Sequence, residues 1–238
     1  MLGQTSGHVS ASWTVVVPFK GGSMAKSRLG HASEGRPGLH PEQRSRLALA
    51  FLRDTVVAAR ATEEVGRVVV VSADPAVRTM LPGVTVVPDP RRGLNAAVEA
   101  GLAWARDHHP GPVAALTGDL PCLSPRDLSA ALDLARRVSL GLVPDKEGSG
   151  STLITATTPG VGVTPRFGPG SCQAHRRAGH AVLPVRADSS LRQDVDTVSD
   201  LRRALERGAG MTTEFAALQW RTDRTPRTHP FPGTRRTA

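Results

Sequence analysis

Two short acidic segments, far apart in the chain, carry the residue types best suited to chemistry. Asp119 follows an apolar and β-branched run at residues 113–116, and Pro121 prevents that predicted strand from continuing. Asp194 and Asp196 lie at the end of another short apolar stretch. A lone Asp at a strand end caps a helix as readily as it binds a ligand. Two separated carboxylate segments, however, suit a hard cation such as Mg²⁺, which is typically held by one or two carboxylates plus substrate phosphates.

A basic loop follows the first predicted strand and offers the complementary charge. It contains Lys20, Lys26 and Arg28, with Gly21 and Gly22 between the first two cations. Three cations suit a polyphosphate because they neutralise its charge, and glycine lets the backbone approach closely. A solvated basic loop is the simpler alternative if charge alone is considered. The loop matches neither the P-loop pattern nor the dinucleotide-binding fingerprint, so it belongs to neither of these two nucleotide-site classes.

Three stretches rich in small residues could also meet a ligand. Asn95 opens a predicted helix, where it could cap the helix or hydrogen-bond the edge of a base. The turns at residues 148–152 and 168–171 could bind anions through backbone N–H groups, and Ser171 begins a helix. His175 follows one helical turn later. We expect it either to contact the residues of this turn without touching the ligand, or to be exposed. We do not expect it to act as a base.

The elements that position these residues follow from the hydrophobic pattern. Short apolar, β-branched runs alternate with segments of helical spacing. We predict strands at residues 13–17, 68–71, 84–87, 113–116, 152–156 and 181–185, and helices that begin near residues 41, 74, 94, 124, 171 and 198. This alternation predicts a mainly parallel sheet with helices on both faces. In such a sheet the basic loop and Asp119 open onto the same edge, where ligands bind.

Length and charge indicate one core with polar ends. The 238 residues suffice for a single sizeable α/β domain, which we place at residues 13–210. Residues 1–12 are predicted to be a disordered N-terminus, and residues 211–238 a basic disordered tail. The chain has 30 Lys and Arg against 21 Asp and Glu, a net charge of +9. Such an excess favours anionic partners.

The cysteines and the apolar runs of the chain indicate the cellular compartment of the protein. Cys122 and Cys172 are the only cysteines and have no CxxC spacing, so neither a zinc site nor a disulfide framework is indicated. No apolar run approaches the ~20 residues of a membrane span, and residues 1–12 lack the apolar centre of a signal peptide. These features predict a cytoplasmic protein with reduced thiols and no membrane partner.

Nucleic-acid binding is the main alternative from a different class of function, given the positive charge. Aromatic residues make up only 3% of the chain and Tyr is absent, which disfavours stacking on bases. No helix-turn-helix, zinc-finger or RNP pattern is present, so no specific nucleic-acid partner is expected. A non-catalytic scaffold would require Lys20, Asp119 and Asp196 all to be incidental.

Taken together and in this order, seven motifs resemble the phosphoenolpyruvate/2-phospho-L-lactate guanylyltransferases of coenzyme F420 biosynthesis. They lie at residues 17–20, 25–29, 93–95, 118–121, 148–153, 167–171 and 194–197. The resemblance covers roughly residues 13–207. The chain lacks the Leu-Ala-Ala-Gly type of loop found in most of the wider nucleotidyltransferases and has Pro18-Phe19-Lys20-Gly21-Gly22 there instead. It also has Ser151-Thr152 where relatives often have Thr-Asn.

The resemblance implies a fold and a reaction. The fold is a Rossmann-like nucleotidyltransferase fold, with a mixed but mainly parallel sheet and helices on both faces. The reaction condenses GTP with phosphoenolpyruvate or 2-phospho-L-lactate and releases pyrophosphate. The Arg-rich, Lys-poor composition is typical of GC-rich actinobacteria, whose relatives favour phosphoenolpyruvate. Another magnesium-dependent nucleotidyltransferase with a different phosphate acceptor stays open, as does a transient contact with the next enzyme of the pathway.

The resemblance also implies roles for individual residues. Asp119 and Asp196 would hold Mg²⁺, with Asp194 as a third candidate ligand. The predicted substrate contacts fall into four groups: Lys20 to the acceptor or α-phosphate; Lys26 and Arg28 to the triphosphate; Asn95 to the nucleotide; and Ser151, Gly168 and Ser171 to the carboxylate and phosphate of the acceptor. Catalysis would then rest on Lys20, Asp119 and Asp196.

Overall fold

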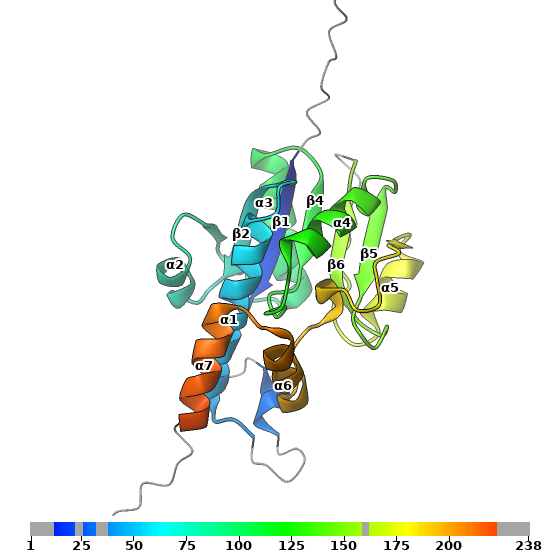
Figure 1. Ribbon diagram of the computed structural model, residues 1–238. Coiled ribbons are helices and arrows are strands. Elements are labelled where there is room, and N and C mark those ends of the chain that lie inside the picture. The colour runs from blue at the N-terminus through cyan, green and yellow to red at the C-terminus, as the bar shows by residue number, and fades with distance from the viewer. Residues whose placement is uncertain (1–11, 22–25, 32–37, 159–161, 223–238) are drawn as a thin grey trace, which may run out of the picture.

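The computed structural model describes residues 12–21, 26–31, 38–158 and 162–222, which form a twisted sheet between layers of helices (Figure 1). In the described residues the sheet has seven strands in the order β3-β2-β1-β4-β6-β5-β7. The strands are β1 (Trp13–Phe19), β2 (Val65–Ser72), β3 (Thr85–Val87), β4 (Val113–Leu116), β5 (Leu140–Pro144), β6 (Ser151–Ala156) and β7 (Ala181–Val182). Only β6 runs antiparallel to its neighbours among these strands, so the predicted mixed, mainly parallel sheet is confirmed.

Helices cover both faces of the sheet, as the alternating pattern predicted. They are α1 (Pro41–Arg60), α2 (Ala76–Met80), α3 (Leu94–His108), α4 (Pro125–Ala135), α5 (Ser171–Arg177), α6 (Val198–Arg207) and α7 (Met211–Thr222), with 3₁₀ turns η1 (Ser27–Gly30) and η2 (Ser190–Arg192). Apolar residues of α1 and α4 pack on one face of the sheet, and those of α3 and α5 on the other. Figure 1 shows α1 and α4 in front of the sheet.

Strand β1 lies inside the sheet between β2 and β4, and every one of its residues is buried. Trp13, Val15 and Val17 belong to the cluster under α1 and α4, whereas Val16 packs under α3. Helix α3 lies so close to β1 that a Cβ added at Gly101 would come within 2.3 Å of the Val16 side chain. A continuous apolar run buried on both faces is typical of a parallel central strand.

The order of the strands places a ligand crevice at the carboxyl end of β1. From β1 the chain adds β2 and then β3 on one side, and returns to add β4 on the other. Ligands of open α/β sheets bind at such a switch point, because the loops after the two central strands diverge there. The loop after β1 and the segment after β4 carry the predicted cations and Asp119, respectively.

The C-terminal prediction is wrong for residues 211–222, which form α7 and not a disordered tail. Asp54 of α1 accepts hydrogen bonds from the backbone N–H groups of Thr212 (3.2 Å) and Thr213 (2.7 Å). These donors would otherwise be unpaired at the start of a helix. Ala217 is fully buried in a cluster with α1 and α6. The folded domain therefore extends beyond residue 210, while the predictions for residues 1–11 and 223–238 lie outside the described residues.

Three smaller points complete the fold. The predicted strand at 181–185 is shorter in the structure. Beyond β7, the Leu183 N–H still donates to the Leu142 carbonyl, but Pro184 has no N–H to continue the pairing. Both cysteines are free thiols. Within the described ranges, every helix is too short or too polar to cross a lipid bilayer.

Candidate active site

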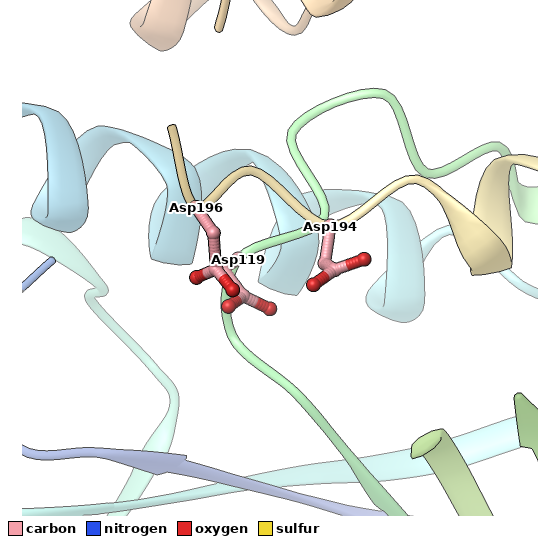
Figure 2. Close-up of side chains that lie close together, drawn as sticks. All are labelled: Asp119, Asp194 and Asp196. Carbon is pink, nitrogen blue, oxygen red and sulfur yellow. The ribbon is translucent and has the colours of Figure 1, made fainter. Parts of the chain in front are cut away.

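Three aspartates from two distant segments meet beside the carboxyl end of β4. Asp119 follows β4, and Asp194 and Asp196 lie between η2 and α6. One carboxylate oxygen from each residue lies within 4.8 Å of the others. Figure 2 shows the side chains of Asp194 and Asp196 projecting from one segment toward the same side, beside Asp119. The two segments are joined directly, because the Val195 N–H donates to the Asp119 carbonyl over 3.1 Å.

Asp200 shapes the segment that carries Asp194 and Asp196. It is almost fully buried, and its Oδ2 accepts hydrogen bonds from the backbone N–H groups of Asp196 (3.2 Å) and Thr197 (2.8 Å). Thr197 in turn accepts from the Asp200 N–H, so the two residues form a reciprocal cap at the start of α6. This cap determines where the chain leaves the acidic cluster.

Lys146, in the turn after β5, holds the same segment. Its ammonium group donates to Asp200 Oδ1 over 2.5 Å and to the Asp194 carbonyl over 3.4 Å. Burial acts to raise the pKa of Asp200, but the hydrogen bonds from Lys146 and Arg203 hold it well below the ordinary value. Sequence reasoning missed both Lys146 and Asp200. The Thr-x-x-Asp spacing of a helix cap at residues 197–200 was a signal that could have found Asp200.

Lys26 supplies the positive charge inside the acidic cluster. Its ammonium group contacts the carboxylates of Asp119 and Asp196, the latter at 2.8 Å. Arg28 Nη1 reaches the other oxygen of Asp196 over 3.2 Å. Burial acts to lower the pKa of Lys26, yet the two carboxylates raise it above the ordinary value. Two of the three cations that sequence reasoning singled out are therefore directed at the predicted metal ligands.

The carboxylates retain binding capacity that the protein does not use. Asp119 Oδ1 and Asp194 Oδ1 are buried without a hydrogen-bond partner among the described residues. Burial, together with the negative charges of Asp119 and Asp196, raises the pKa of Asp194 to about 7. Buried polar atoms are normally satisfied, so these carboxylate oxygens have capacity left to bind a cation. An all-oxygen set of this kind fits a hard divalent metal ion.

Lys20, the third predicted cation, lies in the crevice beside the cluster. It lines a cavity of about 220 Å³ together with Lys26, Asp119 and Phe167. A second cavity of about 470 Å³ continues from it toward β2 and β3, and Lys20 lines that cavity too. The predicted catalytic residues Lys20, Asp119 and Asp196 are thus gathered in one region by the fold.

Asn95 is engaged with the main chain of another predicted segment. Its side-chain amide donates to the Phe167 carbonyl over 3.1 Å and accepts from the Phe167 N–H over 2.7 Å. The start of α3 is thereby tied to the turn that precedes α5. The predicted contact between Asn95 and a nucleotide stays a prediction, and the contact that the structure shows is the one with Phe167.

Ser151, Ser171 and His175 form one buried unit. The Ser151 N–H donates to Ser171 Oγ over 2.9 Å. His175 Nε2 accepts from the Arg166 N–H over 2.9 Å, so the proton of the neutral ring lies on Nδ1, 3.0 Å from Ser151 Oγ. His175 is fully buried, and burial lowers its pKa to about 4. Of the two roles expected for His175, the supporting one is therefore the one observed.

This buried unit and Gly168 belong to two turns that sequence reasoning assigned to an acceptor. Gly168 has a φ of 132° and no atom within 4 Å of the position that a Cβ would occupy, so its backbone is open on that side. The hydrogen bond between Ser151 and Ser171 joins the two turns. The fold thus brings the predicted acceptor residues together, although they are distant in the chain.

Comparison with known proteins gives consistent matches along the chain. Residues 13–219 match the family described as "Guanylyl transferase CofC like". The phosphoenolpyruvate guanylyltransferase of Streptomyces scabiei (strain 87.22) is 46% identical over 217 residues, which cover 87% of this chain and 96% of that protein. The enzyme of the same name from Geodermatophilus obscurus is 46% identical over 205 residues, covering 85% and 92%.

The fold is shared with solved nucleotidyltransferases. A nucleotidyl transferase from Methanothermobacter superposes with a TM-score of 0.56 at 19% identity, and the match covers 82% of this chain and 96% of that one. At this identity the likeness concerns the fold, and it confirms the nucleotidyltransferase fold expected from the sequence.

Proposed function

The chain belongs to the CofC-like guanylyl transferase family, and we propose that it transfers the guanylyl group of GTP to phosphoenolpyruvate with release of pyrophosphate. The observation that carries this proposal is the meeting of Asp119, Asp194, Asp196 and Lys26 in a chain 46% identical to phosphoenolpyruvate guanylyltransferases. 2-Phospho-L-lactate is the second candidate acceptor, because it too carries a carboxylate and a phosphate on adjacent positions.

The reaction needs positioning more than proton transfer. A phosphate oxygen of the acceptor attacks the α-phosphorus of GTP and forms a P–O–P bond. The bond from the α-phosphorus to the bridging oxygen of the β-phosphate breaks, and pyrophosphate leaves with that electron pair. A phosphate monoester has a second pKa of about 6 and is mostly ionised at neutral pH, so no general base is required. The barrier is repulsion between anions and charge on the leaving group, which preorganised cations relieve.

We assign Mg²⁺ to the acidic cluster, held by Asp119, Asp194 and Asp196. The unpartnered Oδ1 atoms of Asp119 and Asp194 support this assignment. When bound, the ion would supply positive charge to the phosphates of GTP and the acceptor. The chain contributes the placement: the Val195–Asp119 hydrogen bond and the Asp200 cap hold the carboxylates at one point before any substrate arrives.

The basic residues would bind the triphosphate. Lys26 and Arg28 already lie at the cluster, and both sit on η1 or directly before it. Lys26 has a left-handed backbone with a φ of 50°, which turns the chain at the edge of the crevice. Lys20 lines the cavity that joins the cluster to the larger one, so it is suited to the α-phosphate or the acceptor phosphate.

The turns at Ser151, Gly168 and Ser171 would receive the acceptor. The Ser171 hydroxyl accepts from the Ser151 N–H, and among the described residues its own proton has no acceptor, so it could donate to an anion. The open backbone at Gly168 allows an anion to approach the N–H groups of that turn. A carboxylate and a phosphate on neighbouring carbons match such paired donors.

The proposal is tested by pyrophosphate release from the purified full chain with GTP and Mg²⁺. Phosphoenolpyruvate and 2-phospho-L-lactate are supplied separately, and a parallel reaction includes the enzyme that consumes the product. We expect release with phosphoenolpyruvate. Release only with 2-phospho-L-lactate would reassign the acceptor. Absence of release with both, also in the coupled reaction, would overturn the proposal and favour a nucleotidyltransferase with another phosphate acceptor. A rate increase beyond that of product removal would support a direct contact with the consuming enzyme.

A further inference from the structure

The larger cavity beside the acidic cluster has the size and walls for a flat base. Its volume is about 470 Å³, and it shares Pro18, Phe19, Lys20 and Leu94 with the smaller cavity. A nucleotide whose phosphates lie at the cluster can therefore extend into it. Leu94 lines the cavity and is 45% exposed, so it offers an apolar wall on which a base could pack.

Asp89 brings a carboxylate into this cavity. It lies in the connection between β3 and α3, and its Oδ1 accepts the backbone N–H of Arg91 over 2.7 Å. Among the described residues, no hydrogen bond to the other oxygen, Oδ2, is found. Arg91 has a φ of 59°, a backbone conformation that a residue other than glycine seldom adopts. The turn thus holds one oxygen of Asp89 in place and leaves the other to a ligand.

We infer that Asp89 selects guanine over other bases in this cavity; the inference rests on the proposed function, since it takes GTP as the substrate. Guanine presents two adjacent donors, N1–H and the 2-amino group, and a carboxylate accepts both. Adenine presents the lone pair of N1 at the same place, which a carboxylate repels.

The start of α3 offers the complementary donors for the O6 atom of guanine. Gly93 is the N-cap of α3 and also lines the cavity. Within the described part of the chain, no side chain caps this helix, so N–H groups of its first turn are available to a carbonyl oxygen. An acceptor from Asp89 and a donor from α3 together read one edge of guanine.

Asp74, the other carboxylate of the cavity, packs against the loop after β1. Its Oδ1 accepts the Ala76 N–H over 3.0 Å at the start of α2. Its Oδ2 faces Gly21 so closely that a Cβ there would lie 2.5 Å away. The packing against Gly21 leaves less room for a base beside Asp74, so Asp89 is the carboxylate that we assign to the base.

The test measures equilibrium binding by calorimetry to the full chain, with Mg²⁺ and without acceptor. GTP is compared with ITP, which lacks only the 2-amino group, and with N1-methyl-GTP, which lacks the N1–H donor. For the wild-type chain we expect GTP to bind about tenfold or more tightly than either analogue. Asp89→Asn keeps an oxygen for the Arg91 N–H and places an amide donor against the base. It should bring the GTP-to-ITP ratio close to one, mainly by weakening GTP.

Asp107→Asn is the matched control, because Asp107 is an exposed carboxylate near the far end of α3 that pairs with Arg106. It should keep the wild-type ratio. Equal binding of GTP and ITP by the wild-type chain, no measurable binding of GTP, or an unchanged ratio in Asp89→Asn would each overturn the inference. If Asp89→Asn does not fold, the binding of ITP and N1-methyl-GTP to the wild-type chain still tests whether the cavity recognises these two donors of guanine. Pyrophosphate release is measured separately. A chain that prefers GTP but releases no pyrophosphate would contradict the proposed reaction and leave the assignment of Asp89 intact.

Discussion

The backbone N–H of Val195 donates to the carbonyl oxygen of Asp119 over 3.1 Å. This one hydrogen bond joins the segment after β4 to the segment before α6, which are 76 positions apart in the printed sequence. The carboxylates of Asp119, Asp194 and Asp196 are brought within 4.8 Å of one another in spite of their mutual repulsion. This backbone hydrogen bond therefore holds the two segments together. Side-chain variants at the cluster should lower the activity more than they lower the stability of the fold.

Asp119→Asn is expected to lower the rate of pyrophosphate release at least about a hundredfold, the loss typical when a main electrostatic group is removed. The fold should persist, because Asp119 Oδ1 has no partner among the described residues and the Val195 contact uses the backbone. Activity with GTP and phosphoenolpyruvate is measured together with the melting temperature. Asp188→Asn, at an exposed carboxylate paired with Arg186, serves as the control. Wild-type activity in Asp119→Asn would contradict the assignment of the cluster.

Lys26→Met tests the role of the ammonium group as a counter-ion to the cluster. Without it, the carboxylates of Asp119 and Asp196 lose their positive partner, which we expect to cost about 1–3 kcal/mol of unfolding free energy in buffer with EDTA. Mn²⁺ or Mg²⁺ should restore much of this loss because the ion neutralises the same carboxylates. Melting temperatures with and without the metal measure the effect. An equal loss in both buffers would mean that Lys26 and the metal ion act at different places.

Lys146 and Asp200 should behave as a coupled pair that positions the acidic segment. Asp200→Ala leaves the Lys146 ammonium group without its carboxylate and removes the cap of α6, so a loss of about 3 kcal/mol is expected. The double variant Lys146→Met/Asp200→Ala should be less destabilised than the sum of the single variants. Urea denaturation measures all three, and metal affinity should fall in Asp200→Ala. Strict additivity would show that the two side chains do not act together.

His175 should make stability depend on pH in a defined window. Its pKa is lowered to about 4 in the folded chain, from an ordinary value of 6.5, because the ring is buried. Its stabilising contribution is therefore complete above pH 6.5 and is lost as the pH falls toward 4, by up to about 3 kcal/mol. Urea denaturation between pH 4.5 and 7.5 (roughly the range in which an unfolded His titrates) should show a smaller decline in His175→Gln than in the wild-type chain. The same decline in both would refute a neutral, buried His175.

Several parts of the fold could be predicted from local pattern alone. Some signals act over a few residues: the apolar runs of β1 and β4, the proline that begins α1 and the serine before α4. Their elements were therefore predicted nearly in place. Helix α7 was not predicted because its stability is not local. Its first N–H groups are capped by Asp54, more than 150 positions earlier in the chain, and its own sequence has little helical periodicity.

By itself, the sequence determined which residue types are available and at which strand ends they lie. Asp119, Asp194, Asp196 and the basic loop were identified because two carboxylate segments and a cluster of cations at strand ends suit a metal ion and phosphates. Only the tertiary structure decided the pairings: Lys26 with the two carboxylates, Asp200 with Lys146, and Asn95 with Phe167. These contacts join residues from 54 to 170 positions apart, and no periodicity in a sequence encodes which distant partner a side chain meets. That choice is made by packing of the whole chain, where each buried charge or amide must find its partner.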